Sequence, residues 1–303
     1  MNKVLVVIGP TSVGKTKMGV ALAKHFNGEV ISGDSMQIYK GMDIGTAKVK
    51  ESEMEGIKHH CIDILDPFEN YSVKDFQTQV RKTIEDIVSR GKLPIIVGGT
   101  GLYIKAALYD YEFSETEDNH DEFRKKYSHL SDDGLYDYLK TIDPQSALEL
   151  HPHNRQRVLR AIEIYEQTGK RKSDIVNSQQ HICLYDAYFI GLTMDRTLLY
   201  QRINQRVDLM REEGLEKEVD QLYQSGLTRE HQSMKAIGYK EWFDYFEGLI
   251  SREDVYENIK KHSRQYAKRQ YTWFKNQFPV HWYDVCIECF DHTVQQVIED
   301  IEE

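Results

Sequence analysis

The sequence of 303 residues and 35.5 kDa is long enough for about two domains, or for one large α/β domain with an insertion. Hydrophobic residues make up 40% of the chain and charged residues 29%, so a normal core can form and wholesale disorder is excluded. The formal net charge of −10 excludes a generally basic nucleic-acid-binding surface, but it permits a local basic patch.

The first part of the chain alternates between strand and helix patterns. β-Branched runs predict buried strands over residues 1–8, 29–32 and 94–97. Apolar residues at helical spacing predict helices over residues 16–26 and 71–90. The order strand–helix–strand–helix–strand is typical of a parallel sheet with right-handed crossovers.

Composition changes near Phe113, where residues 114–121 are mostly acidic and polar. We expect an all-helical domain at residues 113–182, inserted into a discontinuous core of residues 1–112 and 183–303. Within the insertion, helices are predicted over residues 123–130, 135–141, 144–150 and 155–168. Beyond it, we predict a strand at 185–194, helices at 196–213, 215–225 and 254–277, and a last strand at 281–285.

A phosphate-binding motif lies between the first predicted strand and the first predicted helix. The pattern G-x-x-x-x-G-K-[ST] is matched by Gly9, Pro10, Thr11, Ser12, Val13, Gly14, Lys15 and Thr16. In such a loop the backbone N–H groups and the helix N-terminus face phosphate oxygens, Lys15 supplies a cation, and the Thr16 hydroxyl binds Mg²⁺. The motif predicts a bound polyphosphate, as ATP or as another molecule. With the predicted sheet it indicates an α/β fold: a P-loop NTPase-like core whose central, mainly parallel sheet is flanked by helices, plus the helical insertion.

A nucleoside triphosphatase of this class also carries an acid at the end of a second strand. The strand at 94–97 ends instead in Gly98-Gly99-Thr100-Gly101, a glycine turn that lets backbone approach a ligand. Asp34 follows the strand at 29–32, so we expect it at the carboxyl edge of the sheet. There it could hold Mg²⁺, accept a proton from a nucleophile, or cap a helix.

A series of motifs resembles the bacterial tRNA dimethylallyltransferase family, also called tRNA isopentenyltransferases, over residues 3–285. Besides the phosphate-binding loop, the motifs are Asp34-Ser35-Met36-Gln37-Ile38-Tyr39, Asp43-Ile44-Gly45-Thr46-Ala47-Lys48, His59-His60-Cys61-Ile62-Asp63, Gly98-Gly99-Thr100-Gly101-Leu102-Tyr103, Asn154-Arg155-Gln156-Arg157-Val158-Leu159-Arg160-Ala161, Ala236-Ile237-Gly238-Tyr239-Lys240-Glu241 and Tyr266-Ala267-Lys268-Arg269-Gln270 through Trp273-Phe274.

The resemblance implies transfer of the dimethylallyl group from dimethylallyl diphosphate to the exocyclic amine of adenosine 37, on the 3′ side of the anticodon. The products are isopentenyladenosine and pyrophosphate. The loop then holds an isoprenoid diphosphate, which agrees with the missing acid. Asp34 is our choice of base, Lys15 stabilises the leaving pyrophosphate, and Thr100 hydrogen-bonds the bridging oxygen. Arg202 and Arg206, four apart on one helix face, are expected on the diphosphate, with Arg206 favoured.

RNA binding has two signals on this acidic chain. Lys260, Lys261, Arg264, Lys268, Arg269 and Lys275 lie in a stretch without acids and with interleaved aromatics, which suits phosphate contact and base stacking. The other is a cluster of arginines in the insertion. With the resemblance, the predicted tRNA contacts are Asp34, Ser35, Met36, Gln37, Thr100, Arg124, Gln156, Arg157, Val158, Leu159, Arg160, Lys268 and Arg269.

Three alternatives stay open. A small-molecule kinase explains the phosphate loop but not the basic stretch, and an RNA-binding module leaves Asp34 and Thr100 without a role. An adenylate isopentenyltransferase would not need the insertion.

Other classes of protein are excluded by the cysteines and by the apolar runs. The four cysteines are too few and scattered for a disulfide scaffold, and the lone Cys286–Cys289 pair lacks the partners of a zinc site. The apolar run of residues 4–8 is too short for a membrane span. We expect no signal peptide and a cytoplasmic monomer without membrane contact.

Overall fold

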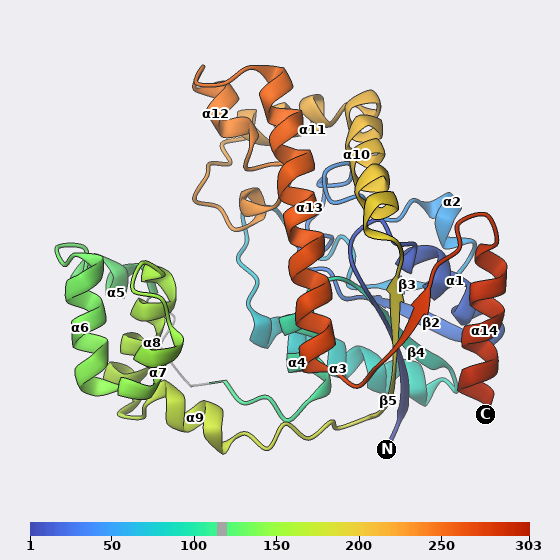
Figure 1. Ribbon diagram of the computed structural model, residues 1–303, viewed down its shortest axis with the longest axis horizontal. Helices are drawn as coiled ribbons and strands as arrows, with labels where there is room; N and C mark the ends of the chain where they lie inside the picture. The colour runs from blue at the N-terminus through green and yellow to red at the C-terminus, as the bar shows by residue number, and fades with distance from the viewer. Residues whose placement is uncertain (114–119) are drawn as a thin grey trace. The chain divides into compact units, whose positions relative to one another are not determined.

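The computed structural model describes residues 1–113 and 120–303, which fold into two compact units. The core unit consists of Met1–Tyr109 and Cys183–Glu303, and the inserted unit of Asp110–Ile182 (Figure 1). In the core unit, Tyr109 and Cys183 form an antiparallel bridge, so the chain leaves and rejoins this unit at adjacent points.

The core unit is built on a six-stranded sheet in the order β3-β2-β4-β1-β5-β6, and every neighbouring pair is parallel. The central strand β1 alternates between two faces: Val4, Val6 and Ile8 enter one hydrophobic cluster, while Leu5 and Val7 enter another. Both faces are therefore covered, and the predicted parallel α/β fold is confirmed. The strands are β1 Lys3–Ile8, β2 Gly28–Ser32, β3 His59–His60, β4 Leu93–Val97, β5 Asp186–Thr193 and β6 Val280–Asp284.

Helices of the core unit bury one apolar face each against the sheet or against a neighbouring helix. Residues of α1 and α14 contribute to one cluster, and residues of α3, α4 and α10–α13 dominate the other. A disulfide joins Cys286 to Cys289 just before α14. The helices are α1 Lys15–His25, α2 Glu51–Met54, α3 Val73–Ser89, α4 Gly101–Leu108, α10 Arg196–Glu213, α11 Leu215–Gln224, the 3-10 turn Ser233–Lys235, α12 Trp242–Phe246, α13 Arg252–Gln277 and α14 Phe290–Glu302.

The described part of the inserted unit is helical and has its own core, which includes Leu135, Leu139 and Val158. Asp143 is fully buried there, and its carboxylate accepts hydrogen bonds from the backbone and hydroxyl groups of both Ser146 and Ser173. The first helix ends at Lys126, four residues before its predicted end. The helices are α5 His120–Lys126, α6 Asp132–Ile142, α7 Pro144–Glu149, α8 Arg155–Thr168 and α9 Lys172–Ser178.

Among the residues that the structure describes, no helix has both the length and the apolar character needed to cross a membrane.

Candidate active site

Three turns meet at the carboxyl edge of the sheet. They follow β1, β2 and β4, which are neighbours in the sheet, and the carboxyl ends of parallel strands lie at one edge. The turns after β2 and β4 are pressed together, because a Cβ on Gly98 would lie 2.3 Å from the backbone of Gly33. In addition, Thr100 N donates to Gly33 O at 3.1 Å. The first turn carries the predicted phosphate loop, and the other two carry Asp34 and Thr100.

The loop after β1 has the backbone of an anion-binding turn. Gly9, Ser12 and Gly14 have φ angles of 144°, 66° and 105°, which bend the chain sharply before α1 begins at Lys15. A Cβ on Gly9 would lie 2.5 Å from Leu192 O, so this position requires glycine. The Ser12 hydroxyl is buried and has no hydrogen-bond partner among the described residues. The first turn of α1 contains no acidic residue, so its N–H groups and dipole can face an anion.

Three basic side chains converge on this loop. Lys15 Nζ donates to Pro10 O at 2.7 Å, Arg202 Nε donates to Ser12 O at 3.0 Å, and Arg206 donates through Nη1 to the Thr11 hydroxyl at 3.1 Å. The structure thus brings both arginines of α10 to the loop. Burial, followed by the nearby charge of Arg206, lowers the pKa of Lys15 to about 7. Burial also lowers the pKa of Arg206, while the Asp34 carboxylate opposes this shift.

Asp34 and Thr100 lie on the turns after β2 and β4, which are packed tightly against each other. Asp34 Oδ1 accepts the N–H of Met36 at 2.9 Å, which is an Asx turn and not a helix cap. Its Oδ2 has no hydrogen-bond partner within residues 1–113 and 120–303. The Thr100 hydroxyl accepts the N–H of Ser35 at 3.1 Å and lies 3.3 Å from the Ser35 hydroxyl. Both predicted catalytic side chains are therefore held by hydrogen bonds to the neighbouring residues Ser35 and Met36.

Met36 and Gln37 form part of the wall beside Asp34. Met36 is half-buried and packs against the main hydrophobic cluster. The Gln37 amide is held by the protein: its Oε1 accepts from the Ser32 hydroxyl at 3.0 Å, and its Nε2 lies 3.4 Å from the carbonyl oxygens of both Thr46 and Ala47. The Gln37 amide thus supports the segment of Thr46 and Ala47. Arg206 contacts the same segment, because its Nη2 lies 3.4 Å from Ala47 O.

Helix α13 covers the turn after β4, and this contact was not predicted. The Tyr266 hydroxyl and Gln270 Nε2 both donate to Gly99 O, at 3.3 and 3.0 Å. A Cβ on Gly101 would lie 2.2 Å from the Trp273 ring. The glycines of this turn therefore make room for side chains of α13, whereas the sequence suggested that they admit a ligand. Burial raises the pKa of Tyr266 to about 12, so its hydroxyl stays protonated at neutral pH.

The basic stretch on α13 divides into paired and unpaired side chains. Lys260 forms an ion pair with Asp208 of α10 at 2.8 Å, and Arg264 donates to the Asn204 side chain. Lys268 and Arg269 are exposed, and neither has an ion-pair partner in the described part of the chain. Only Arg269 rests on an aromatic ring, that of Tyr266, at 5.8 Å. Two of the predicted basic residues thus hold α13 to α10, while Lys268 and Arg269 face solvent.

The predicted contacts in the inserted unit lie around the start of α8. Gln156 and Arg157 are exposed, and Arg160 pairs with Glu163 at 2.7 Å. Val158 is fully buried in the core of the unit, so the structure gives this side chain a packing role in place of the predicted contact. A cavity of about 370 Å³ opens beside this helix, and its lining residues include Arg124, Arg155, Gln156 and Leu159.

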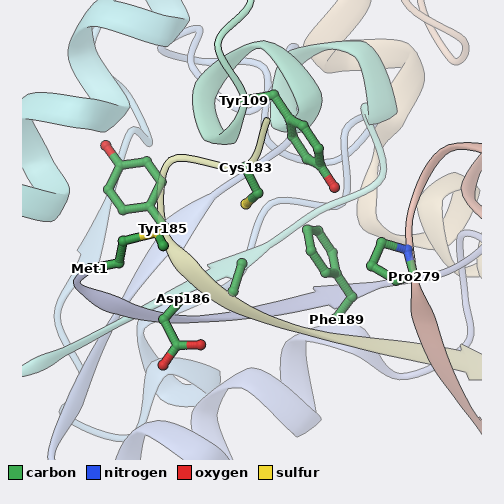
Figure 2. A pocket seen from close by; sticks show the side chains of 8 residues that line it. Met1, Tyr109, Cys183, Tyr185, Asp186, Phe189 and Pro279 are labelled. Carbon is green, nitrogen blue, oxygen red and sulfur yellow. The ribbon is translucent and has the colours of Figure 1, made fainter. Parts of the chain in front are cut away.

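A larger cavity, of about 520 Å³, lies elsewhere in the core unit. It is found near the amino ends of β1 and β5 and is walled by Tyr109, Tyr185, Phe189 and Pro279, with Asp186 at its margin (Figure 2). None of the residues predicted for the site lines it. The chemistry-bearing side chains therefore gather at the opposite edge of the sheet.

The hydroxyl groups of Ser12 and Thr16 at the phosphate loop suit a magnesium ion that is also bound by phosphate oxygens. No cluster of three or more His, Cys, Asp or Glu that could hold a metal occurs among residues 1–113 and 120–303. Mg²⁺ in phosphate sites is bound by one or two protein oxygens together with phosphate oxygens and water. The exposed Thr16 in the first turn of α1 and the orphaned Ser12 hydroxyl in the loop fit that requirement.

A parallel sheet that carries a phosphate-loop motif, convergent basic side chains and an adjacent carboxylate is typical of α/β enzymes that act on polyphosphates. Comparison with known proteins makes this more specific. The family model described as IPP transferase matches residues 37–277. The chain belongs to this family.

Relatives match over nearly the whole chain. The tRNA dimethylallyltransferase of Anoxybacillus flavithermus is 53% identical over 302 residues, covering 99% of this chain and 96% of the relative. The tRNA delta(2)-isopentenylpyrophosphate transferase of Staphylococcus epidermidis is 48% identical, with a TM-score of 0.74 and coverage of 100% and 99% of the two chains. A eukaryotic dimethylallyltransferase acting on tRNA is 35% identical, with a TM-score of 0.86 and coverage of 98% and 78%.

Proposed function

We propose that this chain is a tRNA dimethylallyltransferase, which transfers the dimethylallyl group of dimethylallyl diphosphate to the exocyclic amine of adenosine 37 in tRNA. The observation that carries the proposal is the meeting of three turns at one sheet edge. Together they supply an anion-binding loop, a carboxylate with a free oxygen and a hydroxyl fixed beside it. Membership of the IPP transferase family supports this choice over other polyphosphate enzymes.

The diphosphate would occupy the loop after β1. Its charge would be met by the N–H groups at the start of α1 and by Lys15, Arg202 and Arg206, which already converge there. Mg²⁺ held through the Thr16 hydroxyl would add Lewis-acid stabilisation of the departing pyrophosphate. The partial burial of Lys15 and Arg206 strengthens these interactions, because water screens them less there than at the open surface.

In the transfer step the adenine amine nitrogen forms a bond to C1 of the dimethylallyl group. The bond between C1 and the bridging oxygen breaks, and its electron pair leaves with pyrophosphate. The proton lost by the amine goes to Asp34 Oδ2, which is free to accept it. The Thr100 hydroxyl can turn from Ser35 to the bridging oxygen, where negative charge develops.

The RNA would contact the exposed residues Lys268 and Arg269 of α13 and, in the inserted unit, Arg124, Gln156 and Arg157. Chemistry on a base within a stacked loop requires the base to leave the stack, so adenosine 37 would be extruded toward Asp34. As further parts of this proposal, the enzyme acts as a monomer and in the cytoplasm.

The proposal is tested by incubating the protein with labelled dimethylallyl diphosphate, Mg²⁺ and unmodified tRNA, with ATP and AMP as competitors. We expect label in tRNA at adenosine 37 and release of pyrophosphate. Label in AMP but not in tRNA would instead identify an adenylate isopentenyltransferase. ATP hydrolysis or phosphoryl transfer as the main activity, abolished by Lys15→Ala, would identify a kinase.

A further inference from the structure

One buried amide ties together two of the turns at the carboxyl edge. Gln270, on α13, has 5% of its surface exposed. Its Oε1 accepts the N–H of Thr11 at 2.9 Å, and its Nε2 donates to Gly99 O at 3.0 Å. Thr11 belongs to the phosphate loop, and Gly99 directly precedes Thr100. A single side chain thus bridges segments that are almost ninety residues apart in sequence.

The surroundings of Gln270 are shaped to admit this bridge. A Cβ on Gly99 would lie 2.1 Å from Gln270 Nε2 and 4.0 Å from Lys15 Nζ, so any larger residue would displace the amide. Tyr266 and Trp273 occupy the same face of α13, one turn before and one turn after Gln270, and both touch the turn of Gly99 to Gly101. The helix therefore fits onto the turn through three side chains, and Gln270 alone also reaches the phosphate loop.

The bridge connects two groups that are expected to act on the same diphosphate. On one side, the Thr11 hydroxyl accepts from Arg206, which lies at the expected diphosphate position. On the other side, Gly99 sets the position of Thr100, whose hydroxyl is expected on the bridging oxygen. We propose that Gln270 is a positioning residue, which fixes the distance between the phosphate loop and Thr100 so that both act on the same diphosphate. This inference rests on the proposed function.

The chemistry of the side chain explains why an amide is needed. The bridge requires one acceptor for Thr11 N–H and one donor for Gly99 O, at the length of a glutamine. Methionine has a similar length but provides neither group in useful strength. Glutamate can accept from Thr11, yet when ionised it cannot donate to Gly99 O and it places a negative charge near the diphosphate. A protonated glutamic acid offers one donor and one acceptor and can replace the amide.

The test compares Gln270→Met with the matched control Gln265→Met, an exposed position on the same helix. We measure kcat, the KM for dimethylallyl diphosphate, tRNA affinity and thermal unfolding. For Gln270→Met we expect kcat/KM for the isoprenoid to fall by about 10- to 100-fold, because small misplacements of reacting groups are costly. Its tRNA affinity should change less than about 2-fold, since the amide faces inward. Gln265→Met should match the wild type in every measurement.

Gln270→Glu is the second variant. Its side chain has the same shape as that of glutamine, so it still tests the inference if Gln270→Met does not fold. Its activity relative to the wild type at the same pH should recover as the pH falls and the carboxyl group becomes protonated. A deficit that does not change with pH would overturn the inference, as would a Gln270→Met enzyme with wild-type kinetics or one that loses tRNA affinity equally. If the wild type and Gln265→Met transfer no label to tRNA, the proposed function itself fails, independently of Gln270.

Discussion

Positive charge is placed in two physically different settings in this molecule. At the carboxyl edge of the sheet, Lys15 and Arg206 are half-buried beside the phosphate loop, and burial lowers the pKa of each. On the outer side of α13, Lys268 and Arg269 project into solvent. One helix connects the settings, because Gln270 of α13 bonds the phosphate loop from the inner side.

The two settings differ in how their charges act on a bound ligand. Enclosed charges act strongly at short range on a ligand of defined shape, but their protonation depends on their surroundings. Exposed charges keep their protonation over a wide pH range and act through counterion release, so their effect depends on salt. We therefore expect changes at the enclosed site to alter turnover, and changes on α13 to alter RNA affinity.

The largest effect is expected for Asp34→Asn, because general base catalysis contributes about 10²- to 10⁴-fold to such reactions. The amide can still accept the N–H of Met36, so the turn and the binding of both substrates should be preserved. Single-turnover transfer to tRNA, measured with saturating isoprenoid, should slow by that factor. Turnover near that of the wild type would remove Asp34 from the role of base.

Lys15→Ala and Thr100→Ala should separate binding from bond breaking. Both should lower kcat, by roughly 10- to 1000-fold, as for other donors aimed at developing charge. Lys15 also meets the diphosphate in the ground state, so its loss should raise the KM for the isoprenoid, whereas Thr100→Ala should leave that KM almost unchanged. Steady-state kinetics at saturating tRNA distinguish the two variants. An equal change in KM for both would show that Thr100 also binds the ground state.

The lowered pKa of Lys15 predicts a pH dependence of the reaction with the isoprenoid. The ammonium group loses its proton as the pH rises through about 7, so the diphosphate then meets a neutral side chain. We expect kcat/KM for the isoprenoid to decline above about pH 7, whereas tRNA affinity should stay constant there. Lys15→Arg should abolish the decline, because a guanidinium stays charged. A decline that persists in Lys15→Arg would assign it to another group.

The smallest effect on the chemistry is expected from the double change Lys268→Ala and Arg269→Ala. It should weaken tRNA binding and reduce the salt slope by up to about 0.9 for each phosphate that the variant no longer neutralises. The free energy of unfolding should change by only about 0.5 kcal/mol, since both side chains face solvent. Binding titrations over a range of salt concentrations measure the affinity and the slope, and thermal unfolding measures the stability. An unchanged slope would place RNA recognition in the inserted unit and the segment after β2.

Local sequence patterns predicted most of the sheet and several helices. The β-branched runs identified β1, β2 and β4, and the helices Arg155–Thr168 and Arg196–Glu213 occur at the predicted residues. Strand β3 was missed because two residues carry no periodicity. The P-loop and Asp34 were found because each stands directly after a strand. Gln270 could not be assigned a role, because its contact with Thr11 spans 259 residues and depends on how α13 crosses the turns.

The antiparallel bridge between Tyr109 and Cys183 has a consequence for how such a chain can change over evolutionary time. Because Tyr109 and Cys183 are paired with each other in the core unit, a segment of any length can be inserted between them without moving a strand of the sheet. The first and last residues of the inserted unit are also hydrogen-bonded to each other. Asp110 N–H donates to Ile182 O at 3.0 Å, and Ile182 N–H donates to the Asp110 carboxylate at 2.8 Å. Each unit can therefore diverge, lengthen or be exchanged under its own selection.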